Sequence, residues 1–149
     1  MQTGLYDWET ISTDLAQLRR DRKAIEATAT AEVGRLEETM HTANKNLGKF
    51  FFKLVEERDF DNPFMTVTVS LVDFTNDYEF PALFQASYFY EGHCESYFIL
   101  PVLTNLDSSR KVNSLTHPIG SMSSLDWFAP LGDLAKFVIR DTPRPRQAE

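Results

Sequence analysis

His93 and Cys94 are the adjacent pair whose side-chain types could support nucleophilic catalysis, because a histidine can take the proton of a thiol. Neighbouring residues on an extended strand point to opposite faces, so these two side chains cannot readily share a proton. The sequence also lacks a glycine-rich phosphate loop, a paired-cysteine motif and a His-Glu metal pattern. We therefore expect no enzyme activity and no cofactor, and we expect Cys94 to be a small core or strand-end residue.

An acidic group formed by Asp73, Asp77 and Glu79 carries the oxygen ligands that Ca²⁺ prefers. The segment lacks the number of ligands and the glycine of a dedicated calcium loop. A solvated acidic turn is therefore the expected structure, and no metal site is predicted.

Composition and charge restrict the partners of the chain. Its 149 residues suit one domain, or a long helix with a small domain, and its net charge is −7. No Lys or Arg lies between Arg58 and Arg110, which argues against direct nucleic-acid binding. No apolar run approaches the roughly 18 residues of a membrane span, and no signal peptide is evident. The single Cys94 fits a reducing compartment, so an intracellular protein without a membrane partner is expected.

The N-terminal part predicts one long helix, because no proline lies between about Asp7 and Glu57 and apolar residues recur at steps of three and four. A helix of that length is about 75 Å long, more than the following residues can cover. We therefore expect residues 1–58 to form a dimeric coiled coil; the alternative is an amphipathic helix folded back on its own head. The predicted dimerisation residues are Ile11, Leu15, Leu18, Ile25, Val33, Leu36, Met40, Leu47, Phe50 and Leu54.

Residues 59–141 predict a small α+β head. Apolar and polar residues alternate from Met65 to Leu71, and two further strands are expected over 83–90 and 96–103, joined by a turn at 91–93. Together they predict a three-stranded antiparallel meander.

The rest of the head and the tail follow from composition. A packed, irregular segment is expected over 104–126, and a terminal helix is expected to begin at about Pro130, whose fixed φ suits a first helical position. Residues 142–149 are expected to form a flexible tail.

The head has an excess of apolar residues, since ten of the twelve Phe lie between residues 50 and 98. Either the end of the coil and a dimer mate cover these side chains, or an exposed groove binds an apolar segment of another protein.

Two motifs accompany this order of elements: Pro101-Val102-Leu103 at the end of the third strand, and Pro130-Leu131-x-x-Leu134-x-x-Phe137 at the start of the last helix. Together they resemble the RWD-headed coiled-coil proteins of the kinetochore, in particular the coiled-coil subunit of the monopolin complex. The resemblance implies a parallel homodimer in the nucleus whose heads bind apolar segments of kinetochore proteins. The corresponding partner-binding residues here are Leu115, Ile119, Met122 and Leu125, with Phe98 and Leu100 of the third strand.

The first functional hypothesis is therefore a homodimeric adaptor in chromosome segregation, which gains avidity from two heads. The alternative is an acidic α+β chaperone or inhibitor that masks a client protein. That alternative predicts short or antiparallel helical contacts and an exposed sheet instead of a long parallel rod.

Overall fold

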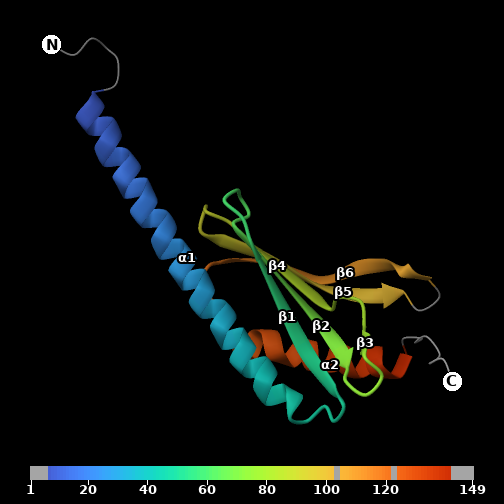
Figure 1. Ribbon diagram of the computed structural model, residues 1–149. Coiled ribbons are helices and arrows are strands. Elements are labelled where there is room, and N and C mark those ends of the chain that lie inside the picture. The colour runs from blue at the N-terminus through green and yellow to red at the C-terminus, as the bar shows by residue number, and fades with distance from the viewer. Residues whose placement is uncertain (1–6, 103–104, 122–123, 142–149) are drawn as a thin grey trace.

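The protein has an α+β fold, as predicted, in a computed structural model that describes residues 7–102, 105–121 and 124–141 (Figure 1). A long N-terminal helix precedes an antiparallel sheet, and a second helix ends the described chain. The elements are α1 (Trp8–Asn44), β1 (Phe50–Arg58), β2 (Met65–Asp73), β3 (Tyr78–Glu79), β4 (Phe84–Tyr88), β5 (His93–Val102), β6 (Asn105–Pro118) and α2 (Ser124–Asp141).

The sheet follows the order β1-β2-β4-β5-β6, with β3 paired to β2, and every pairing is antiparallel. The predicted meander corresponds to β2, β4 and β5, but the prediction of only three strands was wrong. Strand β1 comes from the segment expected to be helical and β6 from the segment expected to be irregular, while β3 contains Glu79 of the expected acidic turn.

The long helix ends at Asn44, so the prediction of a helix to Glu57 was wrong. Gly48 has a φ of +64°, a left-handed conformation that glycine adopts without steric cost, and it lies in the turn between the end of the helix and β1. The chain then turns back as β1, and the side-chain amide oxygen of Asn44 accepts a hydrogen bond from the N–H of Phe52 at 2.7 Å. The predicted dimerisation residues Leu47, Phe50 and Leu54 therefore lie beyond α1, two of them in β1.

The predicted irregular segment over 104–126 is largely strand β6, so that expectation was wrong as well. Helix α2 begins at Ser124, which places Pro130 inside the helix and not at its start.

The core lies between one face of the sheet and the two helices, which also contact each other. Alternation along β2 puts one set of apolar side chains on this face, and all of them are buried: Met65, Val67, Val69 and Leu71. From α1 the core receives Ala29, Val33, Leu36, Met40 and Ala43, and from α2 it receives Leu131, Ala135 and Val138.

The opposite face of the sheet is mixed in character, because Val55 and Val72 lie on it beside polar residues and Val55 is 39% exposed. It carries partly exposed side chains such as Thr66, Thr68, Gln85 and Ser87, and neither helix of the described chain covers it. Strand β1 forms one edge of the sheet, and its second half is exposed and mostly charged.

The sheet covers only the C-terminal part of α1, and the N-terminal part projects beyond it (Figure 1). Val33, Leu36 and Met40 are therefore core residues of a single chain, and their burial needs no second copy. The alternative of a helix folded against its own head is correct for this part of α1.

Candidate interaction surface

The projecting part of α1 carries an uncovered apolar stripe. The exposed fractions are 77% for Trp8, 50% for Leu15 and 47% for Leu18, while Ile11 is partly exposed. Their spacing of three and four residues places them on one helix face. That face continues into the residues that pack against the sheet, because Ala29, Val33, Leu36 and Met40 keep the same spacing. We call Trp8, Ile11, Leu15 and Leu18 the N-terminal stripe.

Charge is unevenly distributed along this projecting segment. Residues 7–14 contain three acidic and no basic side chains, whereas residues 19–23 contain four basic and one acidic. The segment therefore has a negative beginning and a positive end.

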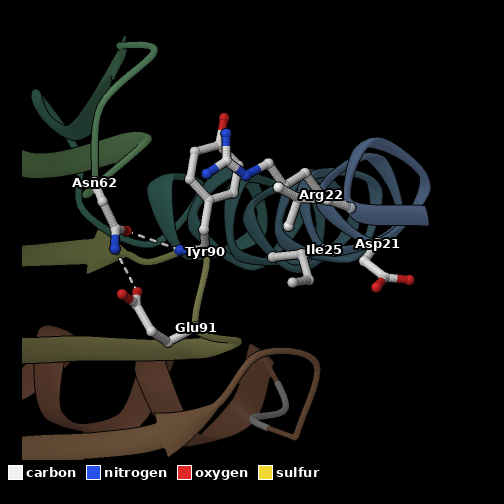
Figure 2. Close-up of a pocket in the computed structure, with 7 residues that line it drawn as sticks. Asp21, Arg22, Ile25, Asn62, Tyr90 and Glu91 are labelled. Carbon is white, nitrogen blue, oxygen red and sulfur yellow. Dashed lines mark hydrogen bonds between the residues drawn. The ribbon is translucent and has the colours of Figure 1, made fainter. Parts of the chain in front are cut away.

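A pocket of about 410 Å³ lies where the N-terminal stripe meets the head (Figure 2). Helix α1 contributes one wall, and the loops before β2 and before β5 contribute the other. The lining residues are Leu18, Asp21, Arg22, Ile25, Asn62, Tyr90 and Glu91. We call this the junction pocket.

Tyr90 organises the junction pocket. Its backbone N–H donates to the side-chain oxygen of Asn62 at 2.8 Å, its hydroxyl donates to Glu26 at 2.7 Å, and its ring stacks on Phe64. Figure 2 shows the Arg22 guanidinium across this ring, 4.5 Å from its centroid, a cation–π contact. The hydrogen bond to Glu26, together with burial, raises the pKa of the Tyr90 hydroxyl. These contacts hold an aromatic ring and a cation at the pocket wall.

The rim of the pocket is also ordered by an amide–carboxylate contact. Asn62 donates to the carboxylate of Glu91, a contact drawn in Figure 2. That hydrogen bond is the main reason why the pKa of Glu91 lies below its usual value.

A second polar group is buried under α1. The carboxylate of Glu32 lies 3.1 Å from Nε2 of His117 and accepts a hydrogen bond from the N–H of Gly120 at 2.6 Å. The hydroxyl of Tyr88 donates to the same carboxylate at 3.4 Å. This group joins α1 to β4, β6 and the turn after β6.

Cys94 lies beside this group and is buried, which confirms the prediction of a core residue. The histidine opposite it across the strands is His117, not its neighbour His93. Burial, with the nearby charge of Glu32, raises the pKa of the Cys94 thiol to about 12. A thiol that keeps its proton at neutral pH is a poor nucleophile.

The acidic residues considered for calcium do not converge. Asp73 accepts hydrogen bonds from the backbone and side chain of Asn76, and Glu79 accepts one from Ser70 and lies 3.2 Å from Lys53. Within the described ranges, no three His, Cys, Asp or Glu side chains are placed to hold a metal ion.

The predicted partner-binding residues have different surroundings. Leu115 on β6 is 41% exposed, and Ile119 packs partly against the core. Phe98 is only 8% exposed and its ring lies 5.0 Å from that of Phe84, so its assignment to an exposed patch was wrong. Leu100 and Leu125 lie in β5 and α2, but their side chains and all of Met122 are outside what the structure describes.

Trp8 and the pocket residues were not among the predicted site residues. Trp8 has a usable signal, since it lies three residues before Ile11 on the same helix face. No signal in the sequence identifies the pocket residues Asn62, Tyr90 and Glu91, because the pocket combines side chains from three separate segments.

No family model matches the sequence, and neither the curated proteins nor the solved structures contain a significant match. Neither helix, over the residues described, combines the length and hydropathy of a membrane-spanning segment.

Proposed function

We propose that this protein is a homodimeric adaptor that binds other proteins and dimerises through the N-terminal stripe of α1. The observation that supports the proposal is the exposure of Trp8, Leu15 and Leu18 on one face of a continuous helix. Burying a large apolar side chain contributes about 1.5–3 kcal/mol, so covering this stripe would drive association. The protein acts by binding and not by catalysis; the buried thiol of Cys94 supports this part of the proposal.

The heads provide the partner contacts in this proposal. Leu115 offers an exposed apolar side chain on β6, close in sequence to the turn that Glu32 fixes against α1. Two such heads on one dimer bind two partner segments with avidity.

Chromosome segregation is the process that we propose for the adaptor, with kinetochore proteins as partners in the nucleus. This part rests on the resemblance in the order of elements to RWD-headed coiled-coil proteins. A fluorescently tagged copy expressed in dividing cells of the source organism should form foci that coincide with a centromere marker. Diffuse fluorescence throughout division would contradict the kinetochore assignment while leaving the dimer untouched.

Sedimentation of the full chain tests dimerisation. We expect a dimer for the wild type and a folded monomer for Leu15→Glu combined with Leu18→Glu. The matched control is Ala24→Glu combined with Ala31→Glu, which adds the same charge at exposed positions outside the stripe and should remain dimeric. A monomeric wild type, or a dimeric double stripe variant, would refute the proposal.

The face of the sheet that neither described helix covers favours the second candidate, an acidic chaperone or inhibitor that masks a client. Thr68 lies near the centre of that face and is partly exposed. If the sheet is the binding surface, Thr68→Arg should abolish partner binding and leave the dimer intact. If the heads bind through Leu115, then Leu115→Asp should abolish binding and Thr68→Arg should have no effect.

A further inference from the structure

The position of the head on α1 restricts how two copies can pair. The N-terminal stripe and the buried residues Val33, Leu36 and Met40 occupy the same face of one helix. The head therefore lies on the side of α1 that a second helix would approach. Paired helices are about 8–10 Å apart, which leaves no room for a sheet between them. A parallel pair in register would place both heads in that space.

An antiparallel pair avoids this conflict. Each copy then contributes the projecting segment before its own head, and the two heads lie at opposite ends. In an antiparallel pair, each apolar position of one helix faces the other type of apolar position on its partner, so Leu15 lies opposite Leu18 of the second copy. The same register places Ile11 opposite Arg22 and Trp8 opposite Ile25.

The junction pocket lies where this register ends. Ile25 and Arg22 line the pocket, so Trp8 of the second copy reaches a cavity of about 410 Å³ bounded by Tyr90 and the Arg22 guanidinium. An indole ring suits such a wall, because its face attracts a cation and its body is apolar.

We infer that two copies pair antiparallel through the segment from Trp8 to Ile25, with Trp8 of each copy in the junction pocket of the other. The inference rests on the proposed function, since it specifies the geometry of the proposed dimer. It replaces the parallel arrangement that the kinetochore resemblance implies, and antiparallel contacts are what the alternative, an acidic chaperone or inhibitor, predicts.

The uneven charge of the segment supports this orientation. The acidic residues 7–14 of one copy lie level with the basic residues 19–23 of the other, whereas a parallel pair places like charge level with like. One local contact opposes it, because Asp14 flanks the stripe and lies near Asp21 of the second copy.

Engineered cysteines distinguish the two orientations. We expect a mixture of Ile11→Cys and Arg22→Cys chains to form a disulfide-linked heterodimer under mild oxidation. Neither variant alone should cross-link, because the engineered cysteines of its two copies are about 16 Å apart along the antiparallel pair. Self-cross-linking of Ile11→Cys, without mixed cross-linking, would overturn the inference and leave the dimer proposal standing. Loss of the wild-type dimer in sedimentation would instead refute the proposed function.

Two further variants test the pocket and the flanking charge. Trp8→Ala should weaken dimerisation at least about tenfold, as expected for a buried aromatic anchor. Asp14→Asn should strengthen an antiparallel dimer at low salt because it removes the contact with Asp21. In a parallel dimer the same change would remove an attraction between Asp14 and Arg19 and weaken association, which would contradict the inference.

Discussion

Glu32 on α1 accepts a hydrogen bond from the backbone N–H of Gly120 at 2.6 Å, although 88 residues separate them in the chain. The second oxygen of the carboxylate lies 3.1 Å from Nε2 of His117, and the side chain is only 2% exposed. A buried carboxylate is costly unless it is hydrogen-bonded, so these contacts fix α1 in one position on the sheet. They also set the direction in which the N-terminal stripe leaves the head.

Replacing Glu32 with Gln should lower the free energy of unfolding by about 1–3 kcal/mol, because the amide nitrogen cannot accept the hydrogen bonds that one carboxylate oxygen accepts. Urea unfolding at a fixed protein concentration measures this difference. Glu37→Gln is the control, since Glu37 is exposed on the same helix and should change stability by less than about 0.5 kcal/mol. Equal effects of the two changes would show that the buried group does not hold α1.

Gly120→Ala should destabilise the fold by about 1–3 kcal/mol. A Cβ at this position would lie 2.7 Å from Cγ2 of Thr28, and the φ of Gly120 is +89°. Gly34→Ala is the matched control, because a Cβ there meets no atom within 4 Å and alanine favours helix by about 0.5–1 kcal/mol. The midpoint temperature of thermal unfolding should therefore fall in Gly120→Ala and rise in Gly34→Ala. A shift of both midpoints in the same direction would contradict the close packing of the turn against α1.

Cys94 should make stability depend on alkaline pH. Burial, with the nearby charge of Glu32, raises the thiol pKa from 9.0 to about 12, so the folded chain keeps a proton that the unfolded chain loses. The resulting stabilisation is fully present below pH 9.0 and is lost as the pH rises towards about 12. We expect the free energy of unfolding to fall less steeply over this interval in Cys94→Ala than in the wild type.

Alkylation gives an independent measurement at Cys94. Iodoacetamide at pH 8 should label the native protein slowly and the urea-unfolded protein rapidly. Rapid labelling of the native chain would contradict the buried, protonated thiol and would reopen the question of a reactive cysteine.

Asp73 should make the stability of the fold depend on acidic pH. Burial alone would raise its pKa, but hydrogen bonds from Asn76 and the charge of Lys49 outweigh burial and hold the pKa below 3.8. The stabilisation is therefore present above pH 3.8 and is lost as the pH falls through the folded-state pKa. Asp73→Asn should be less stable than the wild type at pH 7, with a difference that shrinks on acidification. Asp61→Asn, at an exposed loop position, should show no such difference.

The fold class and the central strands could be predicted because their patterns are local. The alternation from Met65 to Leu71 corresponds to β2, and the core position of Cys94 followed from the lack of any accessible partner at His93. Strand β1 was missed because Phe50 and Leu54 continue a helical spacing across the turn at Gly48, and that spacing does not reveal the left-handed φ of this glycine.

The spacing of apolar residues in α1 could not predict which part of the molecule covers them. A heptad pattern specifies that Val33 and Leu36 are covered, but it does not distinguish a second helix from the sheet of the same chain. The junction pocket is beyond sequence patterns for a related reason, since Arg22, Asn62 and Tyr90 become neighbours only after the sheet and α1 pack together.

The charged edge of the sheet has a consequence for behaviour at high concentration. Strand β1 carries four exposed charged residues beside the exposed Val55, namely Lys53, Glu56, Glu57 and Arg58. An extended chain that added to this edge would have to strip water from those side chains, and that penalty discourages fibril-like growth. Folded copies at high concentration are thereby protected from aggregation at this edge.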